Sequence, residues 1–222
     1  MPRPARLFAI LIGASAASLL GACNIVGPLF VLAHGPEKAP AEFTLDRGKK
    51  TVVFVDDRTN LVSRRSTRLK ISAAAEQALA EHGAVKEIIR SQAIVGAASQ
   101  DSHAEPKSIA ELGSTVGADI VIYATVDFFG LSPDGATFQP TAQFRVKVVD
   151  TLTGERLWPE SREGFSLLVQ MNVRTEQYPQ SAGEVLEREA MLADWSGKRL
   201  AELFYDHAPP SESRVGSSSI RR

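Results

Sequence analysis

Adjacent carboxylates are the first feature of this sequence that could do chemistry. Asp56 and Asp57 follow a short β-branched run, at the position where the strands of α/β sheets tend to bind ligands. Neighbouring strand residues point to opposite faces, so the pair does not form an acid/base dyad as it stands. We therefore favour a turn that caps the next segment. An envelope hydrolase that uses Asp56, Asp57 or His103 is the least favoured function.

A second candidate is the alternating run of Asp101, His103 and Glu105. On a strand these side chains would share a face and could hold a divalent metal. The run precedes Pro106 in a polar stretch, however, and this context favours a solvated loop. The sequence also contains no Gly-x-Ser-x-Gly elbow, P-loop or Gly-x-Gly-x-x-Gly run. We therefore expect no catalytic residue, no metal and no cofactor.

Basic side chains gather just after the two aspartates. Arg64, Arg65, Arg68 and Lys70 surround the start of a predicted helix. A phosphate or an acidic partner could dock there, but cations at this end oppose the helix dipole, so a solvated face is favoured. The candidate interaction surface comprises Asp56, Asp57, Arg64, Arg65 and Arg68.

The single cysteine, Cys23, lies in an amino-terminal export signal. Arg3 and Arg6 precede the apolar residues 7–20, and small residues follow, which is the pattern of a secretory signal. Its end, Leu-Gly-Ala-Cys, resembles a bacterial lipobox. That resemblance implies cleavage between Ala22 and Cys23 and acyl chains, palmitate among them, on Cys23. The chain would then be attached to a membrane through these acyl chains.

An uncleaved anchor is the alternative interpretation of the same segment. No charged residue occurs in residues 7–33, and about 20 apolar residues suffice to cross a bilayer. Either interpretation places the body in an extracytoplasmic space. Asn24 is not the aspartate that favours inner-membrane retention in enteric bacteria, so we expect the periplasmic face of the outer membrane.

Composition predicts one globular domain with appendages. Of the 222 residues, 44% are hydrophobic and 23% are charged, which is a normal globular balance. The net charge of −1 argues against a nucleic-acid partner. The predicted divisions are a signal peptide (1–22), a lipidated tether (23–48), a single α/β domain (49–207) and a disordered tail (208–222).

Apolar periodicity predicts an α+β fold, in which helices pack on a central mixed sheet. The predicted strands are 51–56, 85–89, 119–128, 142–148, 157–158 and 164–173. The predicted helices are 66–82, 106–116 and 182–204, the last with a capping box formed by Ser181 and Glu184. Residues 91–100 carry only a weak pattern. Short turns join the later strands, so this half of the sheet should be antiparallel.

Three segments together resemble a group of extracytoplasmic proteins. They are an opening strand ending in Asp (52–56), a helix-Gly-Ala-Asp-strand unit (109–122), and a strand with an Asp-x-x-Thr-Gly turn and a return strand ending in Trp (146–158). The group includes the curli secretion channel lipoprotein, the amino-terminal domain of TolB and the lipoprotein activators of penicillin-binding proteins. The resemblance implies a TolB amino-terminal-like domain that binds proteins and has no catalytic centre. The resemblance assigns no functional residue to this chain, because the group's interaction surfaces have no fixed motif.

The leading hypothesis is thus a membrane-anchored envelope lipoprotein that acts as an adaptor or regulator by binding envelope proteins. A homo-oligomeric subunit of an export or surface-assembly complex is the alternative.

Overall fold

The structure is a computed structural model that describes residues 38–100, 106–173 and 178–209. The chain divides into two compact units, Met1–Ala39 and Pro40–Arg222, and every helix and strand named in this section belongs to the second unit. Ala22 and Cys23 fall outside the described residues, as do the candidate ligands in 101–105 and the tail after residue 209.

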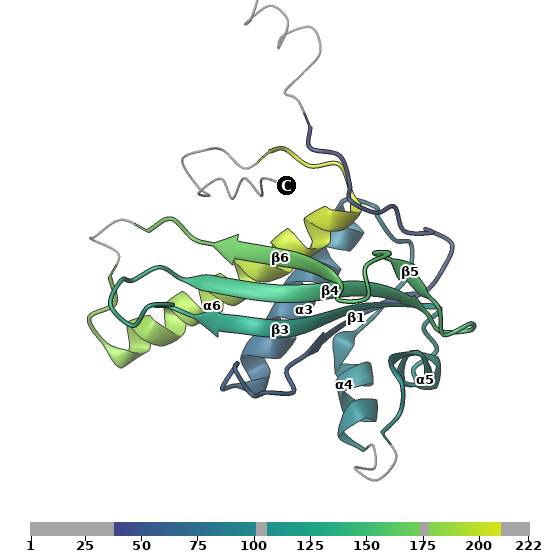
Figure 1. Cartoon of the computed structure of the whole chain (residues 1–222), viewed down its shortest axis with the longest axis horizontal. Coiled ribbons are helices and arrows are strands. Elements are labelled where there is room, and N and C mark those ends of the chain that lie inside the picture. Colours follow the sequence, from purple (N-terminus) through teal and green to yellow (C-terminus); the bar gives the residue numbers. More distant parts are fainter. Residues whose placement is uncertain (1–37, 101–105, 174–177, 210–222) are drawn as a thin grey trace, which may run out of the picture. The chain divides into compact units, whose positions relative to one another are not determined.

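Within these described ranges, six strands form one mixed sheet, as the sequence predicts (Figure 1). The strand order is β2-β1-β3-β4-β5, and β6 also pairs with β4. β1 is parallel to β2 and β3, whereas the β3–β4, β4–β5 and β4–β6 pairs are antiparallel. The strands are β1 (Thr51–Asp56), β2 (Ile88–Ile89), β3 (Ile120–Gly130), β4 (Thr141–Asp150), β5 (Arg156–Trp158) and β6 (Phe165–Gln170).

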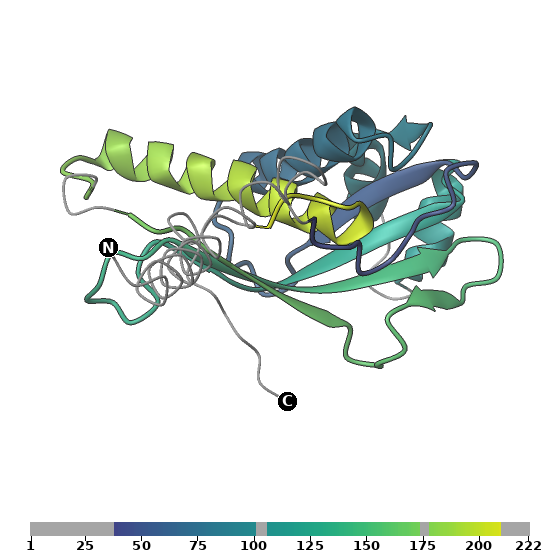
Figure 2. The same cartoon turned by 90° about the horizontal axis from the view of Figure 1, so that it is seen from above.

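Helices cover the two faces of the sheet unequally (Figures 1 and 2). One face carries the long helices α3 (Arg65–Glu81) and α6 (Ala182–Ala201), the second of which continues into η3 (Glu202–Phe204). The other face carries the shorter helices α4 (Ser91–Ser99) and α5 (Ile109–Thr115), which pack against β1, β3 and the end of β4. The outer face of β4 and β6 is therefore left with exposed side chains.

This layering explains the unbroken apolar run of β1. Val53 and Val55 belong to the core beneath α3 and α6, whereas Val52 and Phe54 belong to the smaller core beneath α4 and α5. A strand that is buried on both faces needs apolar residues at every position rather than at alternate ones.

Two elements on the α4 side differ from the prediction. β2 contains only Ile88 and Ile89, because Val85 is buried in the core near the end of α3 before the strand begins. α4 forms in the weakly patterned segment, where Ile94 and Ser91 are the residues that become buried.

The helix ends also differ in detail. α5 begins at Ile109 rather than at Pro106, because Ser108 and Glu111 form a full capping box. At α6, Ser181 accepts the N–H of Glu184 as predicted, but the Glu184 carboxylate accepts the N–H of Gln180 instead of that of Ser181.

Candidate functional site

Asp57 closes the loop between β1 and α3. Its side chain is fully buried and accepts hydrogen bonds from the backbone N–H groups of Leu61 (2.8 Å) and Val62 (2.7 Å). The Arg68 guanidinium on α3 lies 3.2 Å from the same carboxylate. This carboxylate therefore ties the loop to α3 through Arg68, but it does not cap the helix, because α3 begins after Arg64 without a side-chain cap.

Asp56 has a separate set of partners on the α4 side of the sheet. Its Oδ2 atom accepts a hydrogen bond from the Tyr123 hydroxyl at 2.6 Å and another from the Arg58 Nε at 2.9 Å. Burial, reinforced by the hydrogen bond to Asp56, raises the pKa of the Tyr123 hydroxyl. Because the two aspartates make different contacts, the geometry does not assemble a paired acid and base.

A hollow of about 210 Å³ lies between β1, α3 and α4, beside these aspartates. Its wall is partly apolar, with Phe54, Leu69 and Val95, and partly charged, with Arg65 and Arg68. The Arg65 side chain is exposed and makes no hydrogen bond or ion pair with the described residues. Of the candidate surface predicted from the sequence, the structure brings Asp56, Asp57, Arg65 and Arg68 to this hollow.

Arg64 does not join them. Its guanidinium extends to Glu189 on α6, with 3.5 Å between Nη1 and Oε2. Both side chains are substantially exposed, so this ion pair contributes little to stability.

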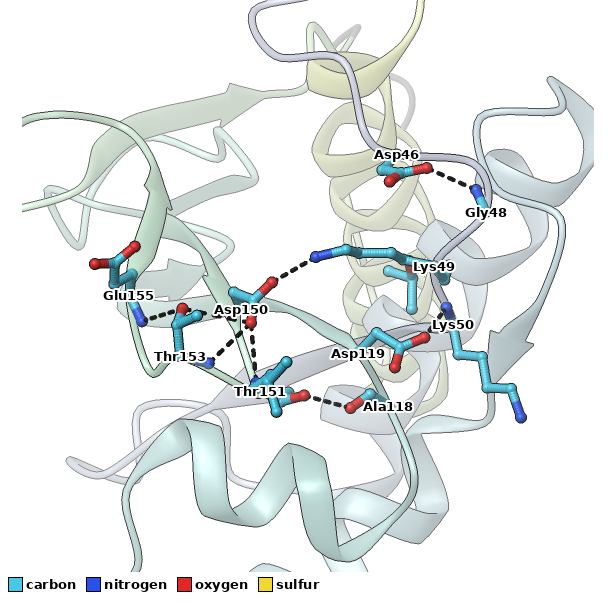
Figure 3. Close-up of polar contacts among 12 residues, drawn as sticks. Asp46, Gly48, Lys49, Lys50, Ala118, Asp119, Asp150, Thr151, Thr153 and Glu155 are labelled. Carbon is cyan, nitrogen blue, oxygen red and sulfur yellow. Dashed lines mark hydrogen bonds and ion pairs between the residues drawn. The ribbon is translucent and has the colours of Figure 1, made fainter.

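A second polar cluster occupies the opposite end of β1 (Figure 3). Lys49 Nζ lies 2.5 Å from the Asp150 carboxylate, which also accepts the N–H groups of Leu152 (2.9 Å) and Thr153 (3.0 Å). The hydrogen bond from Lys49, together with these backbone donors, lowers the pKa of Asp150 from 3.8 to about 2. Asp150 thereby fixes the turn that follows β4.

The same cluster joins two of the motifs seen in the sequence. Asp119 accepts the backbone N–H of Lys50 at 2.8 Å, and the Thr151 hydroxyl donates to the carbonyl of Ala118 at 2.6 Å. The Gly-Ala-Asp and Asp-x-x-Thr-Gly motifs therefore interlock. Sequence reasoning did not foresee this contact, although an aspartate next to each turn was a visible signal. The cluster is structural, since its carboxylates are engaged in these bonds.

A histidine and the two tryptophans of the chain also take structural roles. His82 is the C-cap of α3, and its ring donates a hydrogen bond from Nδ1 to the carbonyl of Ala78 (2.9 Å) while stacking on Tyr205. Trp158 and Trp195 are half-buried and pack against the core beneath α3 and α6. Within the described residues, no three His, Cys, Asp or Glu side chains are placed to hold a metal ion. No helix of the described part has the length and apolar character that a membrane span requires.

No protein-family model matches the sequence, and no curated protein matches it. Several solved structures are similar. The PelC dodecamer from Paraburkholderia phytofirmans is 15% identical, covers 76% of this chain and 96% of its own chain, and has a TM-score of 0.43. The lipoprotein GNA1162 from Neisseria meningitidis is 15% identical over 65% of this chain and 94% of its own, with a TM-score of 0.36.

The carboxy-terminal domain of LpoB from Escherichia coli is also similar. It is 20% identical over 66% of this chain and 94% of its own, with a TM-score of 0.34. At such identities and TM-scores these similar structures assign no function, so any functional proposal rests on the residues of this chain.

Proposed function

We propose that acyl chains on Cys23 hold this protein at a membrane of the bacterial envelope, at the periplasmic face of the outer membrane. Its domain acts there as an adaptor or regulator by binding other envelope proteins. The function is recognition rather than catalysis.

The hollow beside Arg65 is the observation that carries this proposal. It combines an unbonded guanidinium with apolar walls from Leu69 and Val95, while Asp57 and Arg68 hold its rim in place. Arginine in a partly apolar pocket is typical of the residues that contribute most to protein interfaces. An acidic side chain of a partner, carried on an apolar segment, fits this chemistry.

Anchoring supports the same proposal. Leu45 is buried in the core, and the N–H groups of Glu42 and Phe43 bond to the carbonyl of Leu203, so the tether is no longer than residues 24–41. These eighteen residues reach at most roughly 60 Å at about 3.3 Å each. A tether of that length keeps the domain near its membrane and raises its effective concentration toward other membrane proteins. An interface of modest affinity then suffices.

The test is crosslinking in cells of the full-length chain, followed by mass spectrometry of the adducts. We expect an adduct with a different envelope protein that is lost in Cys23→Ala and weakened in Arg65→Glu. Arg162→Glu is the matched control, because Arg162 is an exposed arginine far along the chain from the hollow. The proposal is wrong if the unmodified chain gives no adduct with another protein, or if Arg65→Glu and Arg162→Glu behave alike.

A further inference from the structure

The two edges of the sheet differ in how they are protected. β2 is two residues long and is flanked by the charged residues Lys86, Glu87 and Arg90. β6 is six residues long, and its sequence, Phe-Ser-Leu-Leu-Val-Gln, contains neither a charge nor a proline. Proteins commonly protect exposed edges with short strands, charges or proline, so β6 is an edge without these safeguards.

The free backbone groups of β6 follow from its pairing with β4. Met171 N–H donates to the carbonyl of Pro140 at 2.9 Å, which makes 171 a hydrogen-bonded position in the ladder. Hydrogen-bonded and non-hydrogen-bonded positions alternate in antiparallel pairs. The N–H and C=O groups of Ser166, Leu168 and Gln170 therefore point away from β4. Among the described residues they meet no other strand (Figure 1).

We infer that β6 pairs antiparallel with β6 of a second copy of this chain, with the two-fold axis at Leu168. The paired strands would join the two sheets into one continuous sheet. A two-fold arrangement uses the same surface on both copies, so the strand must be complementary to itself.

The sequence of β6 meets that requirement on the outer face of the sheet. In this register Leu168, which is 39% exposed, faces Leu168 of the second copy. Ser166 faces Gln170 of the second copy, so polar side chains oppose polar ones. Directly opposed side chains are the unit of sheet stabilisation, and no like charges meet here.

The inner face is complementary in the same register. Leu167 of one copy faces Val169 of the second copy, and Phe165 faces Met171 of the second copy. Leu167 and Val169 are both buried beneath α6. Phe165 and Met171 are only half-buried in the single chain and pack at the margin of the core. Pairing would cover both, and apolar burial would add to the backbone hydrogen bonds.

A second copy is favoured as the occupant because the pattern is self-complementary at every position. One strand pair buries a modest area, so the pairing would be populated mainly where anchoring concentrates the copies. The geometry itself does not depend on the proposed partner or on the hollow, since that hollow lies beside β1.

Disulfide trapping in cells tests the pairing on the full-length chain. Hydrogen-bonded antiparallel residues lie about 5.5 Å apart between Cα atoms, within the range a disulfide spans. With Leu168→Cys we expect a disulfide-linked homodimer after mild oxidation, about tenfold above Leu152→Cys. Leu152 is the control because it is 92% exposed at the tip of the β4–β5 turn. The unmodified chain is a second control, because any disulfide-linked dimer that it forms must involve Cys23, its single cysteine.

The register is tested with two differently tagged chains. Ser166→Cys and Gln170→Cys should link to each other when co-expressed, and neither should link to itself. Circular dichroism of each variant checks that the fold is retained.

The inference is overturned if Leu168→Cys and the co-expressed pair give no more dimer than Leu152→Cys, or if the adduct contains a different protein. The partner adduct that Arg65→Glu weakens would persist in that case, so the two proposals fail separately.

Discussion

Asp57 shows at the scale of a single residue how this protein uses its carboxylates. The side chain is buried, and its charge is balanced by two backbone N–H groups and by Arg68. A buried carboxylate in such a setting stabilises the loop, because its removal leaves donors without partners.

We predict that Asp57→Ala lowers the free energy of unfolding by about 2–4 kcal/mol, since three donors lose their acceptor. Urea denaturation measures the change. Glu163→Ala is the control, because that carboxylate is 81% exposed and should matter little. If Asp57→Ala left stability unchanged and abolished crosslinking to a partner, Asp57 would be a contact residue instead.

The lowered pKa of Asp150 implies that the stability of the fold depends on pH. Its pKa is lowered to about 2 in the folded state, chiefly by Lys49, from an ordinary value of 3.8. Folding thus favours the ionised form of Asp150. The contribution of this carboxylate to the free energy of unfolding is therefore complete above about pH 4 and disappears as the pH falls through 2.

We expect the difference in unfolding free energy between the unmodified chain and Asp150→Asn to be constant at pH 5–7 and to shrink between about pH 4 and pH 2. Denaturant titrations across this range measure it. A difference that stayed the same at pH 2 would show that Asp150 does not titrate as the Lys49 contact requires.

At the scale of elements, the contact between α3 and α6 depends on one small residue. A Cβ atom at Gly197 on α6 would lie 2.2 Å from the carbonyl oxygen of Ile71 and 2.9 Å from the backbone nitrogen of Ala75. The two helices can pack this closely only because that position has no side chain.

Gly197→Ala should therefore lower the free energy of unfolding by about 1–3 kcal/mol, because the helices must move apart. Gly96→Ala on α4 is the matched control. A Cβ atom there meets nothing within 4 Å, so it should raise stability by about 0.5–1 kcal/mol through helix propensity. Thermal unfolding of both variants gives the comparison, and equal effects would contradict this account of the helix contact.

Elements with a strong pattern were predictable, and those defined by tertiary contacts were not. The apolar runs of β1 and β3 predict their strands, because both are buried on two faces over much of their length. α4 was missed because a helix that buries little beyond Ile94 has no strong periodicity. At α5, the capping box of Ser108 and Glu111 decides where the helix begins, although Pro106 is also a favourable first helical residue.

The candidate site, too, was predictable only where it depends on residue type and not on tertiary contacts. A turn at Asp57 follows from residue type, but its bond to Arg68 depends on how α3 packs. The hollow itself could not be foreseen, because α4 supplies part of its wall through Val95, Ala98 and Ser99.

At the scale of the whole molecule, the two proposed surfaces are separate. The hollow lies beside β1, and β6 lies across β3 and β4 in the strand order. A partner at the hollow and a second copy at β6 could therefore bind at the same time. Both associations gain from confinement to a membrane, so the anchor at Cys23 is the central claim.

Metabolic labelling with palmitate tests that claim most directly, combined with fractionation of cells that express the full-length chain or Cys23→Ala. We predict that the unmodified chain carries the label and sediments with membranes. Cys23→Ala should carry no label. The account is contradicted if the unmodified chain carries no label, or if Cys23→Ala carries as much label as the unmodified chain. An unmodified chain that sediments with membranes without the label would favour an uncleaved anchor in residues 7–33.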